Sequence, residues 1–279
     1  MNLEVYNPKS TVEVLDLLNK YKRDAKLIAG GTDLVLDLRE KKIKPKAIID
    51  ISNLDELKYI KKDNNYIEIG ASTTFTDIEK SEILTDNLKG LKKAAREVGS
   101  PQIRNRGTIG GNICNASPAA DIVPPLLSLD ATVVIKSKDN KREVSLEKIF
   151  LNKGKIDIKE DEMVLSVKFK NTKGKLGFYK LGLRKALAIS KIATAIYIEK
   201  EDNICKEIRI GNGALGRHGL RERKVEDYLI NKEINEAIIE ASATLLSEEI
   251  EKRLKGRSSL EFKKEAVKGT FKKAFKDAL

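Results

Sequence analysis

Two glycine-rich segments of the chain have residue types that could bind a negatively charged ligand. One of them, residues 106–121, reads Arg-Gly-Thr-Ile-Gly-Gly-Asn-Ile-Cys-Asn-Ala-Ser-Pro-Ala-Ala-Asp. Gly110 and Gly111 have no Cβ, so the backbone there can take a positive φ and approach a ligand closely. Successive N–H groups in such a turn form a nest for anionic oxygens. Side chains that can donate or accept hydrogen bonds flank the pair: Thr108, Asn112, Asn115 and Asp121.

The other segment, Ala-Gly-Gly-Thr-Asp at residues 29–33, is expected where a strand passes into a helix. Unpaired N–H groups and the helix dipole favour an anion at such a point. Alone, this segment is typical of an ordinary strand-to-helix turn. Together with residues 108–112, it has the chemistry to hold a diphosphate from both sides. The residues therefore predict a dinucleotide cofactor.

No other group of residues suggests catalysis by this chain itself. His218 is the only histidine, so the sequence has no Ser-His-Asp triad, no His-based zinc site and no histidine for a covalent flavin link. We expect His218 to be a surface or capping residue. Cys114 and Cys205 are too few for a disulfide framework or an iron–sulfur cluster, and each fits a buried or partner-facing thiol. We expect a chain that holds a cofactor and contributes no catalytic residue and no metal ligand.

Residues 211–216 form a literal GxGxxG pattern directly after a predicted strand. A nicotinamide-binding turn of this type needs an apolar helix immediately afterwards and an acidic residue about twenty positions on. Here Arg217, His218 and Gly219 follow. The pattern is therefore interpreted as a structural turn in preference to a nucleotide site.

The elements expected around the first glycine segment alternate between strand and helix. Strands are predicted at residues 3–6, 26–29 and 47–51, with a helix from residue 11 and a short helix from residue 32. This alternation indicates a small α/β unit. Further strands are predicted at residues 57–61, 66–70, 132–136, 142–145 and 163–169, and helices around residues 75–80, 88–98 and 119–129.

A polar, glycine-containing stretch at residues 171–175 marks a predicted domain boundary. Beyond it we expect three antiparallel strands, at residues 176–183, 192–199 and 204–210, and helices at residues 222–230, 233–247 and 260–276. The predicted fold class is α+β. The predicted domains are residues 1–170, with subdomains of about 1–55 and 56–170, and residues 171–279.

Composition describes a globular protein with a substantial core. Of 279 residues, 41% are hydrophobic and 34% are charged. No apolar run approaches the roughly 20 residues of a membrane helix, and the first residues lack a signal-peptide pattern, so we expect no membrane association and a cytoplasmic protein. The net charge of +12 reflects either a general lysine bias or an acidic partner. Basic residues are interleaved with acids and no aromatic–arginine platform appears, which argues against nucleic acid.

Three stretches make the sequence resemble a known family. They are Ile28-Ala29-Gly30-Gly31-Thr32-Asp33-Leu34, Thr108-Ile109-Gly110-Gly111-Asn112 and Asn115-Ala116-Ser117-Pro118-Ala119-Ala120-Asp121. They are similar to the FAD-binding medium subunits of the molybdenum hydroxylases, most of all to those of xanthine dehydrogenase and nicotinate dehydrogenase. Residues 184–190 and 257–263 are similar to the C-terminal domain of that family, so the resemblance covers nearly the whole chain.

The resemblance implies a noncovalent FAD between an N-terminal domain of PCMH type, built from two small α/β subdomains, and a C-terminal domain with a three-stranded antiparallel sheet and helices. Asp121 is expected to bond a cofactor hydroxyl, and Val164 to contact the adenine side through its backbone. Lys180 either approaches the flavin or is a solvated strand residue, and Ile189 packs near the flavin or in the core. The cofactor-binding residues implied by the resemblance are Leu27, Ile28, Ala29, Gly30, Gly31, Thr32, Asp33, Leu34, Val35, Thr108, Ile109, Gly110, Gly111, Asn112, Asp121, Val164 and Lys180.

The resemblance also implies a division of labour between subunits. Substrate oxidation is expected on a molybdopterin-binding large subunit, and electrons are expected to pass through [2Fe–2S] clusters of a small subunit to this FAD and then to NAD or another acceptor. The sequence departs from the family pattern at Val98 and Phe262, where many relatives have an aromatic residue and a tyrosine. The alternative is a stand-alone flavin-dependent oxidase or reductase. It requires a catalytic base near the flavin, for which the sequence offers no obvious residue.

Overall fold

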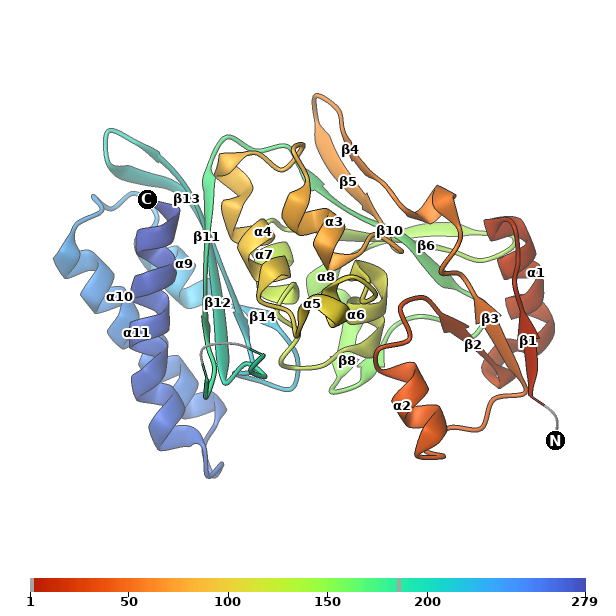
Figure 1. Ribbon diagram of the computed structural model, residues 1–279. Coiled ribbons are helices and arrows are strands. Elements are labelled where there is room, and N and C mark those ends of the chain that lie inside the picture. Colours follow the sequence, from red (N-terminus) through yellow and green to blue (C-terminus); the bar gives the residue numbers. More distant parts are fainter. Residues whose placement is uncertain (1–2, 185–186) are drawn as a thin grey trace.

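The computed structural model describes residues 3–184 and 187–279. Met1 and Asn2, part of the start discussed above, lie outside the described residues, as do Lys185 and Ala186 of the segment 184–190. Three larger sheets follow one another along the molecule (Figure 1). The N-terminal sheet lies at one end, and the helices α10 (Glu236–Arg253) and α11 (Leu260–Ala278) lie at the other.

The first sheet is parallel and has the strand order β1-β3-β2. Val14 and Leu18 of the helix α1 are buried with Ile49 of this sheet in one apolar cluster. The side chain of Ser10 accepts a hydrogen bond from the N–H of Glu13 and so caps α1, which begins at Thr11 as predicted. The elements are β1 (Glu4–Tyr6), α1 (Thr11–Tyr21), η1 (Lys22–Asp24), β2 (Ala25–Ile28), α2 (Leu34–Arg39) and β3 (Ala47–Asp50).

The second sheet is antiparallel, with the order β4-β5-β10-β6-β7. Its central strand β10 pairs with both β5 and β6. The strands are β4 (Ile60–Lys62), β5 (Tyr66–Gly70), β6 (Thr132–Lys136), β7 (Lys141–Ser145) and β10 (Met163–Lys170). The helices and turns around it are η2 (Asp55–Leu57), α3 (Phe75–Lys80), η3 (Asp86–Leu88), α4 (Lys89–Arg96), α5 (Pro101–Arg104), α6 (Ile109–Asn115), α7 (Val123–Ser128) and α8 (Leu146–Ile149). A small hairpin joins β8 (Phe150–Asn152) to β9 (Lys155–Ile156).

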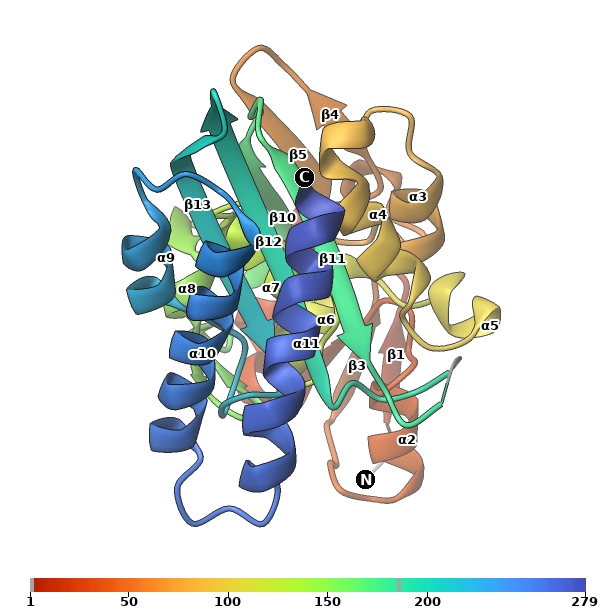
Figure 2. The same ribbon diagram turned by 90° about the vertical axis from the view of Figure 1, so that its left-hand side faces the viewer.

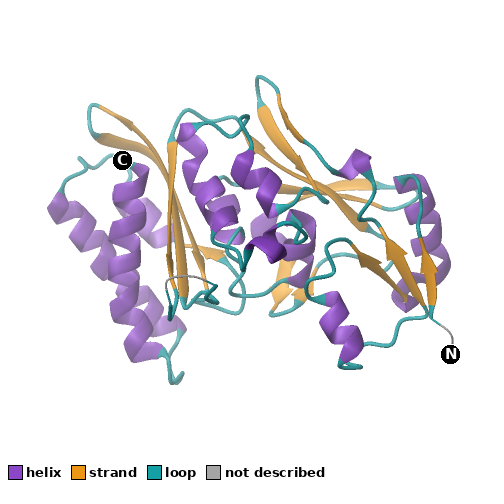
Figure 3. Cartoon of the chain, viewed as in Figure 1, coloured by secondary structure: helices purple, strands orange, loops and turns teal. Residues whose placement is uncertain are grey.

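The C-terminal sheet lies between two layers of helices (Figure 1), and in Figure 2 the helices α10 and α11 lie in front of it. Its order is β11-β12-β13-β14, with β11 (Lys175–Leu181), β12 (Ile192–Glu201), β13 (Ile204–Gly213) and β14 (Leu220–Arg221). The helices α9 (Arg223–Leu229) and α11 pack on one face, with α10 against both of them, and α4 and α7 of the preceding part pack on the other face. The α+β prediction is confirmed: the three predicted long strands are antiparallel, and the two-residue strand β14 extends them. Figure 3 shows the C-terminal sheet in orange with purple helices on both sides of it.

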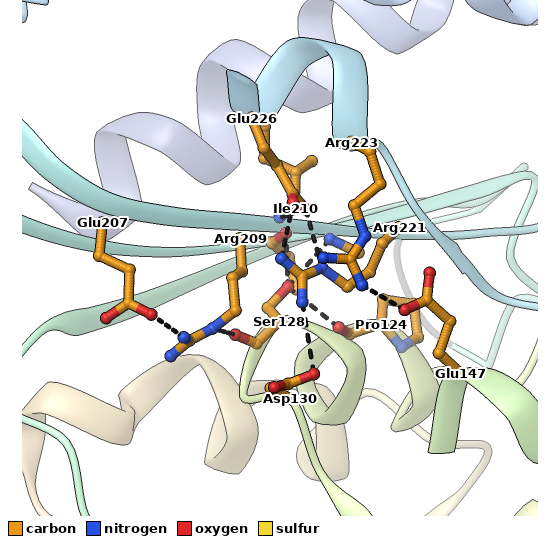
Figure 4. Close-up of polar contacts among 12 residues, drawn as sticks. Pro124, Ser128, Asp130, Glu147, Glu207, Arg209, Ile210, Arg221, Arg223 and Glu226 are labelled. Carbon is orange, nitrogen blue, oxygen red and sulfur yellow. Dashed lines mark hydrogen bonds and ion pairs between the residues drawn. The ribbon is translucent and has the colours of Figure 1, made fainter. Parts of the chain in front are cut away.

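A buried polar network fastens the C-terminal sheet to α7 (Figure 4). Ser128 Oγ donates to the Ala195 carbonyl oxygen at 3.0 Å and accepts from the Gly211 N–H at 2.9 Å. Arg221 forms two hydrogen bonds with the Glu226 carboxylate, at 2.9 and 2.6 Å. Glu226 also accepts from the Ile210 N–H at 2.7 Å. The contacts of Ser128 join α7 to β12 and β13, whereas those of Glu226 hold β13, β14 and α9 together within the C-terminal part.

The GxGxxG segment is not a nucleotide-binding turn. Gly211 and Gly213 lie inside β13, and no helix follows directly. A Cβ on Gly211 would overlap the carbonyl oxygen of Pro124, so this glycine allows β13 to approach α7. The segment thus has a packing role within a strand, and its expected turn begins only at Ala214, which has a positive φ of 61°. Separately, no helix of the described residues has the length and apolar character needed to cross a membrane.

Candidate cofactor-binding site

The first glycine segment turns sharply between β2 and α2. Gly31 has a φ of +72°, a conformation that glycine adopts without strain. Gly30 lies directly against the backbone of Arg106, where a Cβ would overlap the carbonyl oxygen. The main-chain N–H groups of Gly31, Thr32 and Asp33 donate to no other described residue. Three consecutive free donors in one turn are the nest that an anionic oxygen requires.

The second glycine segment begins α6, and its conformation differs from the expected one. Neither Gly110 nor Gly111 has a positive φ; both lie in the helix, whose cap is the Thr108 side chain accepting from the Gly111 N–H at 3.1 Å. Gly110 is buried, and a Cβ there would meet the Ala71 Cβ at 2.7 Å. Gly110 therefore allows α6 to pack closely against Ala71. Gly111 is exposed and leaves open space in front of the helix.

A cavity of about 730 Å³ lies between the two segments. This volume falls within the range of roughly 300–1,000 Å³ for small-molecule and cofactor sites. The predicted residues that line it are Leu27, Ile28, Ala29, Gly30, Gly31, Thr32, Asp33, Leu34, Thr108, Gly111, Asn112 and Val164. The predicted residues outside the lining are Val35, Ile109, Gly110, Asp121 and Lys180.

Three features of the lining fit a flavin adenine dinucleotide. The free N–H groups of residues 31–33 suit a diphosphate, and the apolar side chains of Leu27, Ile156 and Ile158 suit a flat ring. The Oδ1 atom of Asn112 is buried and has no hydrogen-bond partner among the described residues. Because buried polar atoms are almost always paired, a cofactor hydroxyl or ring N–H would satisfy it.

Asp121 and Lys180 are brought together, but they bind each other. Lys180 Nζ lies 2.6 Å from Asp121 Oδ2 and 2.7 Å from the Glu97 carbonyl oxygen. The Ser190 hydroxyl donates to the other carboxylate oxygen of Asp121. The two charged side chains are 6% and 8% exposed, so the solvated alternative for Lys180 is wrong. Burial raises the pKa of the Asp121 carboxyl, against the opposing effects of Lys180 and Ser190.

This pair links the loop before α7 to β11 and to the loop before β12. It therefore fixes where the C-terminal sheet sits relative to the end of the second glycine segment. Ile189, adjacent to Ser190, is 80% exposed and so is not part of the core. The pairing joins residues 59 positions apart, a separation at which the sequence carries no local signal.

Asn115, named above as a hydrogen-bonding side chain, lines the cavity, and its Nδ2 donates to Asp33 Oδ1 at 3.2 Å, which connects the two glycine segments directly. Several other lining residues were not expected from the sequence. Cys114 lines the cavity, as do residues of the segment between β9 and β10: Ile156, Ile158, Lys159, Glu160, Glu162 and Met163. The alternation of Ile156 and Ile158 with polar residues was the one available signal that this segment presents an apolar side.

Known proteins match the chain over its whole length. Residues 1–169 match the family described as FAD binding domain in molybdopterin dehydrogenase, and residues 177–278 match the CO dehydrogenase flavoprotein C-terminal domain. The chain is 38% identical to the nicotinate dehydrogenase FAD-subunit of Eubacterium barkeri, over 100% of the chain and 96% of that subunit. It is 31% identical to the xanthine dehydrogenase FAD-binding subunit of Escherichia coli O157:H7, over 91% and 89% of the two chains.

A solved structure shows the same fold. It is a carbon monoxide dehydrogenase from Hydrogenophaga pseudoflava that lacks the Mo-pyranopterin moiety of its molybdenum cofactor. One chain of it superposes with a TM-score of 0.91 at 28% identity, covering 100% of the present chain and 97% of that chain.

Proposed function

This chain belongs to the FAD-binding medium subunits of the molybdenum hydroxylases, and we propose that it carries electrons from iron–sulfur clusters of a partner subunit to an external acceptor. It is a flavoprotein component of an oxidoreductase. The observation that carries the proposal is the cavity between the two glycine segments, with its three free N–H groups and the unpaired Asn112 oxygen.

The cavity would hold the diphosphate and the adenine of the cofactor. The N–H groups of residues 31–33 and the open space before Gly111 would take the diphosphate. The apolar wall that contains Ile156, Ile158 and Val164 would take the adenine. When bound, FAD supplies reversible electron and hydride transfer. The chain itself binds and orients the cofactor and shields it from water.

We place the flavin ring beside the pair formed by Asp121 and Lys180. Both residues match the family pattern, and the pair lies at the junction with the C-terminal sheet. A lysine ammonium held there by Asp121 and the Glu97 carbonyl would stabilise negative charge at the N1–C2 edge of the ring. Lys180 would thereby favour the reduced form of the cofactor.

The catalytic oxidation of substrate would take place on another polypeptide. We propose a molybdopterin-binding large subunit and a small subunit with [2Fe–2S] clusters as partners, NAD or another molecule as the acceptor, and a cytoplasmic complex. The sheets support a division into an FAD-binding domain at residues 1–170, with subdomains of about 1–55 and 56–170, and a C-terminal domain at residues 171–279.

The visible spectrum and the composition of the native complex test this function. We expect the purified chain to show a flavin spectrum, to release all of its FAD on denaturation, and to oxidise no purine or nicotinate alone. We expect the chain isolated from its source cell to copurify with two subunits that contain molybdenum and iron. A colourless chain would contradict the cofactor assignment, and substrate oxidation by the lone flavoprotein would favour a stand-alone oxidase or reductase.

A further inference from the structure

A second, smaller cavity adjoins the cofactor cavity behind the first glycine segment. Its volume is about 50 Å³, and it shares Ala29, Gly30 and Thr108 with the larger cavity. The remaining lining residues are Ser52, Lys58, Ser72, Thr74, Asn105 and Arg106. Apart from Ala29 and Gly30, every lining residue has a polar or cationic side chain, which distinguishes this cavity from the half-apolar cofactor site.

Ser72 gives the first sign that the cavity binds a ligand. Its side chain is 2% exposed, and its Oγ has no hydrogen-bond partner among the described residues. Its main-chain N–H donates to the Leu57 carbonyl oxygen at 2.9 Å, so the residue is held in place. An unpaired buried hydroxyl is unfavourable and is normally satisfied by water or a ligand.

The charges around the cavity give the second sign. Lys58 and Arg106 form no ion pair within the described part of the chain, and no carboxylate lines the cavity. The carboxylate of Asp77 accepts from the Thr74 N–H and hydroxyl, and that of Asp50 accepts from the Ser52 N–H. Thr108 Oγ accepts from Gly111, which leaves its own proton free to donate.

The size of the cavity limits the ligand. A water-sized group needs about 10–15 Å³ of such space, so the cavity has room for about four oxygen atoms. The buried hydroxyls of Ser72 and Thr108 and the two cations match a tetrahedral oxyanion better than a carboxylate or a larger group. We propose that this cavity is an anion-binding site for one tetrahedral oxyanion, such as inorganic phosphate, and that it is separate from the cofactor site.

An anion bound here would touch both glycine segments from behind. Gly30 belongs to the first segment and Thr108 caps the second, and both line the two cavities. Occupation would hold the segments at a fixed separation and so would tighten cofactor binding; by linkage, the cofactor would tighten anion binding equally. This coupling rests on the proposed function, whereas the anion site itself does not.

Calorimetric titration of inorganic phosphate into the FAD-loaded chain, in chloride buffer of matched ionic strength, tests the site. We expect one phosphate per chain, with affinity reduced at least tenfold in Lys58→Gln and in Ser72→Ala. Lys62→Gln, an exposed lysine on β4 outside the cavity, is the matched control and should bind normally. In phosphate-free buffer, Ser72→Ala should melt at a higher temperature than the native chain, because the unpaired hydroxyl is removed.

Two kinds of outcome would overturn the proposal, and a third would separate it from the proposed function. Absence of saturable binding, or equal binding by all variants, would show an adventitious ion only. Phosphate binding that FAD abolishes competitively would assign the small cavity to the cofactor's own site. Phosphate binding by a chain that contains no flavin would leave the anion site standing while the proposed function fails.

Discussion

Among the glycines of the second segment, Gly111 is the one at which an added side chain should affect cofactor binding more than the stability of the fold. It has no positive φ, and an added Cβ would meet only Thr108 Oγ, at 3.0 Å. We predict that Gly111→Val folds but loses FAD, because the branched side chain fills the space in front of α6. The measurement is flavin absorbance per protein after purification, together with the melting temperature.

Gly269→Val is the matched control for this variant. Gly269 lies in α11 with nothing within 4 Å of its Cβ position, so the same substitution should leave flavin content unchanged. Gly30→Ala should behave differently from both, since its Cβ would overlap the Arg106 backbone and destabilise the fold. Full flavin content in Gly111→Val would remove the second segment from the cofactor site.

The sequence predicted those site residues whose role depends on their neighbours in the chain. Gly31 and Thr32 could be predicted because a tight strand-to-helix turn needs such residues. The positive φ predicted at Gly110 and Gly111 was wrong, because the same residues are also compatible with a helix that packs closely on Ala71. The unpaired hydroxyl of Ser72 and the partner of Asp121 depend on distant parts of the chain, and no local pattern indicates them.

The segment before β10 forms one wall of the cofactor cavity and is held by a buried ion pair. Arg142 of β7 donates to both Glu162 carboxylate oxygens, at 2.9 and 2.8 Å, and the Lys159 N–H donates at 2.8 Å. The hydrogen bonds from Arg142 lower the pKa of the Glu162 carboxyl. The ion pair thus ties the loop that precedes Met163 and Val164 to the edge of the sheet.

We predict that Glu162→Gln lowers the free energy of unfolding at pH 7 by about 1–3 kcal/mol, the usual contribution of hydrogen bonds to a charged group. Because the folded pKa lies below the unfolded value of about 4.3, the stabilisation is present above that pH. It is lost as the pH falls through the folded pKa. Urea denaturation at pH 7 and at progressively lower pH should show the two proteins converging in acid.

Glu160→Gln is the control for this experiment, since Glu160 also lines the cavity but is exposed. It removes the same charge without removing the ion pair and should change stability little at any pH. A constant difference between Glu162→Gln and the native chain across the acidic range would contradict the role of the carboxylate.

Secondary structure was predictable where periodicity and turn residues agree. The strands at residues 66–70 and 132–136 have the predicted bounds. The helix expected at residues 119–129 is shorter, because Ala116 takes a left-handed conformation, Ser117 accepts from the Ala119 N–H, and Pro124 belongs in the first turn. The first hairpin strand starts later than expected because Leu57 ends a 3-10 turn whose carbonyl contacts Gly70.

At the scale of the whole molecule, the sequence indicated the class of each part but not how the parts meet. Three consecutive strands after residue 175, joined by turns, predicted an antiparallel sheet, and the structure confirms it. The sequence could not predict which face of that sheet packs on α4 and α7. The reason is that β12 is buried on both faces, so its residues do not alternate between apolar and polar. The hydrogen bonds that join the sheet to α7 come from Ser128, which meets Ala195 and Gly211 at separations of 67 and 83 positions.

The pair formed by Arg221 and Glu226 joins β14 to α9 beside this junction, and Arg221 also meets Asp130, in the segment between α7 and β6, at 3.4 Å. Both side chains are buried, with exposures of 5% and 6%. We predict that Arg221→Met lowers the free energy of unfolding by about 3–5 kcal/mol, because a buried carboxylate is left without its cation. Chemical denaturation followed by circular dichroism gives this value, and flavin fluorescence recorded in parallel reports whether the cofactor is released in the same transition.

The double variant Arg221→Met/Glu226→Gln separates the charge effect from loss of packing. The glutamine keeps an oxygen that can accept from the Ile210 N–H but carries no charge, so much of the lost stability should return. Arg217→Met, at an exposed arginine near β14, should be close to neutral. Equal stability of the single and double variants would show that packing of the arginine stem, and not its charge, fastens the C-terminal sheet. Release of FAD at a lower denaturant concentration in Arg221→Met than in the native chain would show that this pair also affects how firmly the cofactor is held.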